Sequence, residues 1–143
     1  MSTNFFKIFF SCIAIFAIST ISFSQCNIYA KTKCLPKLKP YLNTEQLYTT
    51  TLLNGDKATL PMTFYYGIEY RIIICAQEAL GKIKFNLKDG NNNIVFTTSA
   101  YSTIMWDFNV ANTQDLTIEV ITADNTTDQL DKSGCASIIV GFK

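Results

Sequence analysis

The sequence predicts an all-β protein: an antiparallel β-sandwich, jelly-roll-like, of about eight strands, preceded by a short N-terminal helical segment. Three observations lead to this prediction. Apolar and polar residues alternate through most of the chain after residue 46, and Gly, Asn, Asp and Pro recur between the alternating runs. No connection between these runs is long enough for the crossover helix of a parallel sheet.

The expected strands cover residues 46–53, 58–64, 68–75, 82–88, 94–98, 104–110, 116–121 and 135–142. Pro61 cannot donate a ladder hydrogen bond, so its strand is expected at an edge or at a bulge. The strand over 68–75 is apolar on both faces and is expected to be central. In the strand over 82–88, lysines occupy one face and apolar residues the other, which indicates a half-buried strand with a lysine-lined outer face.

Residues 1–24 have the pattern of a cleavable secretory signal peptide. Lys7 precedes an apolar run from Ile8 to Ile18, and the small residues Ser22 and Ser24 suit a cleavage site. We therefore expect cleavage after Ser24 and a secreted or periplasmic protein.

Cleavage leaves residues 25–143 as a single domain, with no membrane span. A membrane anchor is the weaker alternative, because a spanning helix needs about 20 predominantly apolar residues and this run is shorter. A lipid on Cys26 is a second alternative, but Gln25 is not the small residue expected before a lipid-bearing cysteine.

Charge and composition exclude several functions. The chain has 12 basic and 11 acidic residues, and the loss of Lys7 with the signal makes the net charge about zero. Nucleic acid is therefore not an expected partner. There is no histidine, which removes Ser-His-Asp and Cys-His catalysis and the commonest zinc ligand. We expect neither a cofactor nor catalysis.

Four cysteines follow the signal, and an even number in an exported domain is typical of two disulfides. They are Cys26, Cys34, Cys75 and Cys135, which allow three pairings. If residues 27–35 are helical, Cys26 and Cys34 are about 12 Å apart, whereas the Cα atoms of a disulfide lie within about 7 Å. We predict Cys26–Cys135 and Cys34–Cys75, which would attach the N-terminal segment to the body of the domain.

The N-terminal segment is expected to form a short helix over residues 27–33, followed by a turn or a second short helix up to Tyr41. Apolar residues recur there at helical spacing, but Pro36 and Pro40 indicate a break.

Several sequence pieces spread over the mature chain carry a resemblance. They are Cys34-Leu35-Pro36 through Pro40-Tyr41, Thr63-Phe64-Tyr65-Tyr66-Gly67, Tyr70-Arg71-Ile72, Trp106-Asp107-Phe108, and Gly134-Cys135 through Val140-Gly141-Phe142-Lys143. In these the chain resembles a group of small secreted proteins of Gram-negative bacteria, cysteine-rich and of β-sandwich type. The resemblance implies export and a single domain, and it implies no activity.

Candidate binding residues are aromatic and cationic. Tyr65, Tyr66 and Tyr101 lie at or near expected loops, where their rings could stack on a sugar or a peptide. Arg71 is the only arginine and lies on the expected central strand. We expect it to pair with an acid as a structural contact, with ligand anchoring as the lesser alternative. Trp106 shares the apolar face of its strand and is expected in the core.

Acidic residues supply two further candidates. Asp124, Asp128 and Asp131 share one loop and offer oxygen ligands for calcium, but their spacing does not match an EF-hand, and a solvated loop is favoured. A hydrolase would need two acids across a cleft, for which Glu69, Glu78, Asp107 and Glu119 qualify by residue type alone. Three of these, Glu69, Asp107 and Glu119, lie opposite the apolar faces of their strands and are expected to be exposed.

The sequence thus predicts an exported, non-catalytic binding or envelope-interaction module, with an envelope protein or a polysaccharide as its partner. The alternative is a carbohydrate-binding module that uses the loop tyrosines, with or without calcium. A hydrolase with an acid pair is the third hypothesis. We expect a monomer.

Overall fold

The computed structural model describes residues 22–124 and 132–143. Most of the predicted signal peptide, and Asp128 and Asp131 of the acidic loop, lie outside these residues. Within the described ranges, no helix combines the length and apolar character needed to cross a membrane.

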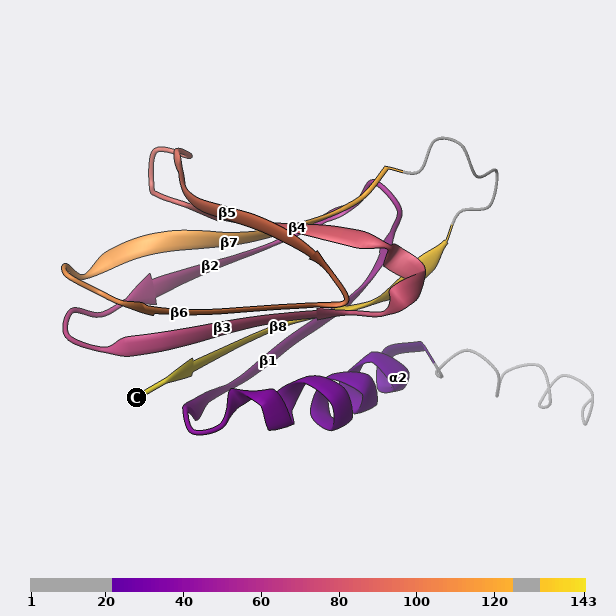
Figure 1. The fold of residues 1–143 in the computed structure, drawn as a ribbon, viewed down its shortest axis with the longest axis horizontal. Coiled ribbons are helices and arrows are strands. Elements are labelled where there is room, and N and C mark those ends of the chain that lie inside the picture. The colour runs from indigo at the N-terminus through magenta and orange to yellow at the C-terminus, as the bar shows by residue number, and fades with distance from the viewer. Residues whose placement is uncertain (1–21, 125–131) are drawn as a thin grey trace, which may run out of the picture.

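Eight antiparallel strands form two four-stranded sheets (Figure 1). The strands are β1 (Leu42–Leu53), β2 (Lys57–Phe64), β3 (Glu69–Ala76), β4 (Lys82–Lys88), β5 (Ile94–Tyr101), β6 (Thr103–Asn109), β7 (Gln114–Thr122) and β8 (Ser133–Phe142). Sheet A has the order β1-β8-β3-β6, and sheet B has the order β2-β7-β4-β5. This interleaving of strands between two sheets is a jelly roll, which confirms the predicted fold class.

The predicted strand positions follow from the alternation and are confirmed in outline. Pro61 lies in β2 at the edge of sheet B, the place expected for a residue that cannot donate to a ladder. β3 is central in sheet A and buried on both faces. β1 begins at Leu42, earlier than expected. Leu42 and Asn43 also pair with β8, and an irregularity separates them from the ladder that starts at Leu47. A short helical turn, η3 (Glu78–Leu80), joins β3 to β4.

The core lies between the sheets and is built from the inward-facing residue of each alternating pair. An aromatic stack closes the side where β5 and β6 meet: Trp106 lies between Phe96 and Phe108, with ring centroids 4.0 and 4.3 Å away. The prediction that Trp106 packs in the core is thereby confirmed.

The N-terminal helical segment lies against the outer face of sheet A (Figure 1). It runs through α2 (Ser22–Tyr29), a π-helical turn η1 (Ala30–Cys34) and a 3-10 turn η2 (Leu35–Leu38). It begins earlier than predicted, at Ser22, and the expected second short helix is the turn η2, where Pro36 sits in the first positions and its missing N–H costs no hydrogen bond.

One of the two expected disulfides is present. Cys26 of α2 and Cys135 of β8 are bonded, with their Cα atoms 5.2 Å apart. Cys34 and Cys75 are free in the structure, so the second expected bridge is not formed. Both thiols are buried in the small apolar cluster between the helical segment and sheet A. The disulfide leaves Cys26 no free sulfur for a lipid.

Gly141 tests the packing of the helical segment on sheet A. A Cβ at this position would lie 2.6 Å from Cδ1 of Leu38 and 2.9 Å from the carbonyl oxygen of Leu42. We expect Gly141→Ala to lower the free energy of unfolding by about 1–3 kcal/mol, the usual cost of overpacking. Urea denaturation measures it. Gly90→Ala is the matched control, because nothing lies within 4 Å of its Cβ position, and an equal loss in both variants would contradict the account.

Candidate ligand-binding face

The two outer faces of the sandwich differ in what covers them. The helical segment lies on sheet A, whereas no described element lies on the outer face of sheet B (Figure 1). We call this outer face of sheet B the open face. An antiparallel sheet can leave one face to solvent in this way, and the polar side chains of that face are then accessible to a ligand.

The strand register sets the outward residues of the open face in rows. One row is Lys57, Ile121, Lys84 and Ser99, and the next is Thr59, Glu119, Asn86 and Thr97. Lys82 and Tyr101 are opposite each other at one end of the face. The lysine-lined outer face predicted for the strand over 82–88 is therefore part of a wider polar surface.

A buried polar cluster occupies the middle of the open face. Asn86 donates from Nδ2 to Oε1 of Glu119 at 2.9 Å, and Lys88 donates from Nζ to Oε2 at 2.9 Å. Thr97 donates to Oδ1 of Asn86 at 2.7 Å. Asn86 is 2% exposed and Glu119 is 4% exposed. The bonds from Asn86 and then Lys88 hold the pKa of Glu119 below its usual range.

The expectation that Glu119 is exposed is wrong. Its position opposite the apolar face was predicted correctly, but side chains of neighbouring strands cover it, including Lys88. Asn86 and Lys88 satisfy both carboxylate oxygens, and Nζ of Lys57 lies 3.9 Å from Oε2, so Glu119 holds together the side chains in the middle of this face.

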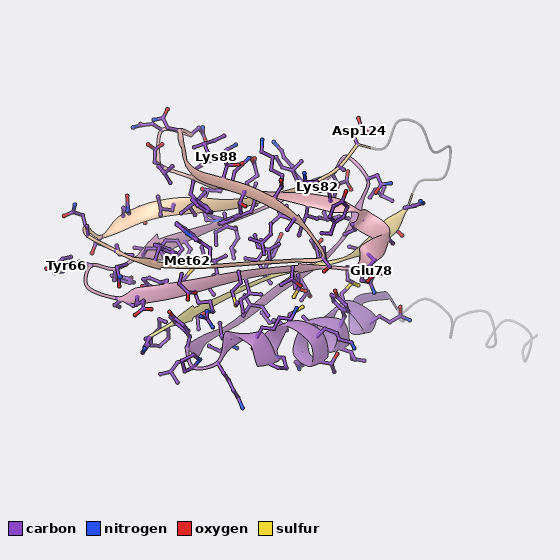
Figure 2. All side chains as sticks on the ribbon, viewed as in Figure 1. Met62, Tyr66, Glu78, Lys82, Lys88 and Asp124 are labelled. Atoms are coloured by element: carbon purple, nitrogen blue, oxygen red, sulfur yellow. A yellow bond between two sulfur atoms is a disulfide. The ribbon has the colours of Figure 1, made fainter. Side chains whose placement is uncertain are left out.

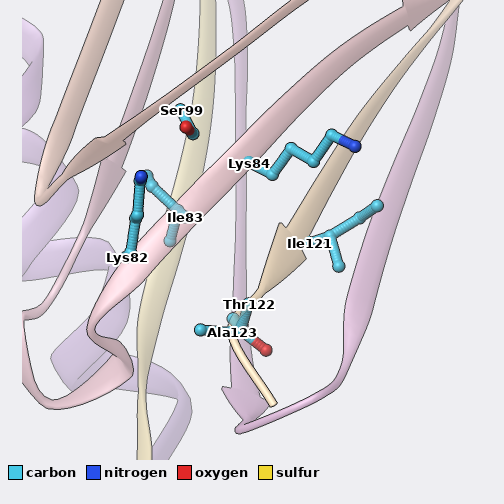
Figure 3. Close-up of a pocket in the computed structure, with 7 residues that line it drawn as sticks. All are labelled: Lys82, Ile83, Lys84, Ser99, Ile121, Thr122 and Ala123. Atoms are coloured by element: carbon cyan, nitrogen blue, oxygen red, sulfur yellow. The ribbon is translucent and has the colours of Figure 1, made fainter. Parts of the chain in front are cut away.

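Beside this cluster the open face is hollowed (Figure 3). The hollow has a volume of about 300 Å³ and is lined by Lys82, Ile83, Lys84, Ser99, Ile121, Thr122 and Ala123. β4, β5 and β7 all contribute to it, and the backbone hydrogen bond from Ala123 N to Lys82 O (3.1 Å) ties the end of β7 to the start of β4.

The lining combines charge, a hydroxyl and an apolar side chain. Lys82 and Lys84 are exposed and form no ion pair with any described residue. Ser99 offers an exposed hydroxyl, and the side chain of Ile121 is half-buried between Lys57 and Lys84. Such a surface can attract an anionic group, bond a hydroxyl and contact an apolar patch on the same ligand.

The three predicted tyrosines do not form one platform. Tyr65 and Tyr66 lie in the turn between β2 and β3, whereas Tyr101 ends β5 at the opposite end of the sandwich. Figure 2 shows Tyr66 at one end of the molecule and Asp124 at the other. The length of β6 separates the two positions, which is about 20 Å at 3.3 Å per residue. Tyr101 belongs instead to the open face.

The turn that carries Tyr65 and Tyr66 is held by hydrogen bonds. The N–H of Tyr65 donates to the hydroxyl of Tyr70 at 3.1 Å, and the N–H of Tyr66 donates to Oγ1 of Thr113 at 3.0 Å. Gly67 has a φ of 77°, a conformation that glycine adopts without strain. Both rings are largely exposed on this well-defined turn.

Arg71 is a structural contact between sheet A and the helical segment. Its Nε and Nη2 donate to the two carboxylate oxygens of Asp107 on β6, each at 2.6 Å. Its guanidinium carbon lies 4.4 Å from the ring centroid of Tyr41, and Nη1 donates to the carbonyl of Lys39 at 3.0 Å. The bonds from Arg71 hold the pKa of Asp107 below its usual range. Nothing in this geometry leaves the guanidinium open for a ligand.

The acids of the hydrolase hypothesis are divided between the two faces. Glu69 accepts a hydrogen bond from the hydroxyl of Tyr41 and lies with Asp107 on the outer face of sheet A, whereas Glu119 lies on the outer face of sheet B. A general acid at neutral pH needs a raised pKa, and the pKa values of Asp107 and Glu119 are lowered.

The calcium hypothesis rests largely on residues outside the described ranges. Asp124 is exposed at the end of β7, and Asp128 and Asp131 are not described. Among described residues, no three His, Cys, Asp or Glu side chains gather in a way that could hold a metal ion.

Sequence reasoning missed the contributions of Ser99 and Ile121 to a common surface. The alternation within each strand gives the face of each residue, but it does not give the order of strands in a sheet. The jelly-roll order places β4 between β5 and β7, and this alone brings Ser99, Lys84 and Ile121 into one row.

No protein-family model and no curated protein matches the sequence. Among solved structures, the chain is similar to PliG of Aeromonas hydrophila, a periplasmic lysozyme inhibitor of g-type lysozyme. The identity is 10% and the TM-score 0.52, over 68% of this chain and 85% of that one. At this identity the likeness concerns the fold alone.

Two further structures show lower similarity. A designed double-stranded β-helix has 15% identity and a TM-score of 0.38, over 68% of this chain and 99% of the design. The carbohydrate-binding module CBM36, solved with calcium and xylotriose, has 14% identity and a TM-score of 0.36, over 73% of this chain and 94% of the module. Neither similarity is high enough to carry an argument.

Glu119→Gln tests the buried polar cluster. We expect it to lower the free energy of unfolding by about 1–3 kcal/mol at neutral pH, because charged hydrogen bonds are lost and Lys88 is left without its counter-charge. The folded pKa of Glu119 is lowered, so its carboxylate stabilises the protein above the unfolded pKa of about 4.3 and ceases to do so as the pH falls through the folded value.

The difference between the wild type and Glu119→Gln should therefore be largest near neutral pH and shrink in acid, as measured by urea denaturation across pH. Glu78→Gln, at an exposed position, is the control, with an expected change within about 0.5 kcal/mol. A Glu119→Gln effect that stays constant down to about pH 2 would contradict the assignment.

Proposed function

We propose that the protein is an exported, non-catalytic binding module and that the open face of sheet B binds its ligand, an anionic polysaccharide of the cell envelope. The observation that carries the proposal is the hollow beside Lys82 and Lys84, two lysines without an ion pair among the described residues, on the one sheet face that no described element covers.

Charge and chemistry favour this ligand class. Two lysines, Lys82 and Lys84, line the hollow, and Glu119 is already neutralised by Lys88 and, at 3.9 Å, by Lys57. Lysine ammonium groups attract carboxylate, sulfate or phosphate groups. The hydroxyl of Ser99 suits a sugar hydroxyl, and the ring of Tyr101 is 72% exposed and suits the apolar face of a sugar ring.

A second candidate partner is an envelope protein, and the turn of Tyr65 and Tyr66 favours it. Exposed tyrosines on a turn whose backbone is already hydrogen-bonded lose little conformational freedom on binding. Tyrosine is also enriched among the residues that dominate protein–protein affinity.

Export is part of the proposal. The signal pattern of residues 1–24 and the disulfide between Cys26 and Cys135 both suit an oxidising compartment. In that compartment we also expect Cys34 and Cys75 to form the second bridge. Both sulfurs lie in the same small cluster, so docking of the helical segment on sheet A brings the two cysteines together.

The oxidant in this step is the disulfide of an exported thiol oxidase. Before the helical segment docks and buries Cys75, its thiolate attacks this disulfide and forms a mixed disulfide, with release of one thiolate of the oxidant. Cys34 then loses its proton and attacks the sulfur of Cys75. The Cys34–Cys75 bond forms, and the second thiol of the reduced oxidant is released.

Mass spectrometry of the full chain, expressed in a bacterium that exports it, tests export. We expect a protein that starts at Gln25, is found outside the cytoplasm and gains about 2 Da for each disulfide on reduction, for two disulfides in total. The Cys34→Ser/Cys75→Ser protein should gain only about 2 Da on reduction, the change expected for a single disulfide. Retention of residues 1–24 would contradict export, and two alkylatable thiols in the wild type would contradict the second bridge.

Binding to a charged polymer tests the proposed ligand class. We expect polygalacturonate to bind the mature protein and its neutral methyl ester to bind at least about tenfold more weakly, because the ester removes the carboxylates that the lysines attract. Lys82→Ala/Lys84→Ala should weaken polygalacturonate binding by about tenfold or more in titration calorimetry.

The matched control is Lys31→Ala/Lys143→Ala, which removes the same charge from residues outside sheet B and should leave affinity within about twofold. Equal losses in the two double variants would contradict a site at the hollow. If Tyr65→Ala/Tyr66→Ala, and not the lysine variant, abolishes capture of one solubilised envelope protein, the second candidate replaces the first.

A further inference from the structure

A second hollow lies where the helical segment meets one end of sheet A. Its volume is about 530 Å³, larger than the hollow of about 300 Å³ on the open face. The helical segment supplies Lys33 and Lys37, the connection from β3 into η3 supplies Gln77 and Glu78, and the turn between β5 and β6 supplies Ser102. We call this hollow the helix–sheet cleft, and Figure 2 shows Glu78 at this end of the sandwich. Small-molecule sites typically measure about 300–1,000 Å³.

Hydrogen bonds fix the walls of the helix–sheet cleft. The hydroxyl of Tyr29 donates to the carbonyl of Ala76 at 2.9 Å. Lys37 donates from Nζ to Oγ1 of Thr103 at 2.9 Å, so the helical segment is bonded to sheet A at two points of the lining. Ser102 has a φ of 62°, which is rare outside glycine, and its carbonyl accepts the N–H of Ala76 at 2.7 Å. Walls held in this way lose little conformational freedom when a ligand binds.

Four polar groups of the lining have no partner among the described residues. Within that part of the chain, the ammonium group of Lys33 and the carboxylate of Glu78 form neither an ion pair nor a hydrogen bond. The hydroxyl of Ser102 has no described partner either. Gln77 uses its Oε1, which accepts the N–H of Cys135 at 2.8 Å, and its amide N–H groups are left to donate.

Opposite charges line this cleft without neutralising each other. Lys33 and Lys37 come from the helical segment, and Glu78 comes from η3. Burial, the two neighbouring cysteines and then Glu78 raise the pKa of Tyr29 to about 12, so the carboxylate acts on the same wall of the cleft that the tyrosine hydroxyl holds. A purely anionic ligand would be repelled by Glu78, and a purely cationic one by the lysines. A ligand that carries both charges satisfies both walls.

We propose that the helix–sheet cleft binds a small zwitterionic ligand of the class of free amino acids and short peptides. The ligand carboxylate lies at Lys33 and Lys37, and the ligand ammonium group lies at Glu78, in charge-assisted hydrogen bonds. Lys37 can contribute because its ammonium group has three donors and Thr103 takes one of them. This site is separate from the open face and does not depend on the ligand proposed there.

The neutral groups of the lining suit the middle of such a ligand. Between its charged ends, a short peptide carries amide N–H and C=O groups that need hydrogen-bond partners. The hydroxyl of Ser102 can donate or accept, and the amide N–H groups of Gln77 can donate to a carbonyl.

NMR titration of the isotope-labelled mature protein with alanine, dialanine and trialanine tests the ligand class. We expect at least one of the three to bind with a Kd below about 1 mM and to shift the backbone amides of Gln77, Glu78 and Ser102. The N-acetyl derivative and the C-terminal amide of that ligand should each bind at least about tenfold more weakly, because each has lost one of its two charges.

Single substitutions test the two walls. Lys33→Ala should weaken binding by about tenfold or more, whereas Lys31→Ala, which removes the same charge from the same segment outside the cleft, should stay within about twofold. Glu78→Gln should weaken the unmodified ligand by about tenfold. It should not weaken the N-acetyl derivative, which has no ammonium group for the carboxylate to bind.

The proposal would be overturned if none of the three ligands shifted these amides at about 10 mM, or if either blocked derivative bound as tightly as the unmodified ligand. Equal losses in Lys33→Ala and Lys31→Ala would also overturn it. Lys82→Ala/Lys84→Ala should bind the ligand like the wild type, so the titration distinguishes this site from the hollow on the open face.

Discussion

The docking of the N-terminal segment on sheet A decides which surface of this protein is available for binding. Arg71 is the central contact. It is held by both carboxylate oxygens of Asp107, and it contacts the ring of Tyr41 and the carbonyl of Lys39. These contacts occupy the outer face of sheet A with the protein's own chain, and the disulfide between Cys26 and Cys135 attaches the other end of the same segment. Sheet B is left as the open side.

The two outer faces therefore use similar residue types for different purposes. On sheet A, an acid and an arginine join two parts of the chain. On sheet B, Glu119, Asn86 and Lys88 satisfy one another in the middle of the face, and Lys82 and Lys84 remain without an ion pair among the described residues. The buried cluster already has its hydrogen bonds, so Lys82 and Lys84 can bind an anion without any rearrangement of Glu119, Asn86 or Lys88.

The sequence was sufficient for the fold class because strand alternation and turn residues are local signals. Pro61 marked an edge strand and the apolar strand over 68–75 marked a central one, and both positions are confirmed. The candidate site was less accessible, since it depends on which strands are neighbours. Glu119 was placed on the correct side of its strand, but its burial arises from residues of adjacent strands. The tyrosines were expected at or near loops, and the topology puts Tyr66 and Tyr101 at opposite ends of the sandwich.

Hydrogen–deuterium exchange of the mature protein with and without polygalacturonate tests the open face most directly. The account predicts slower exchange confined to peptides of β4, β5 and the end of β7, which line the hollow, with unchanged exchange in the helical segment and in β1. Protection of the turn at Tyr65 and Tyr66, or of the helical segment, with none on β4, would contradict the assignment of sheet B as the binding face.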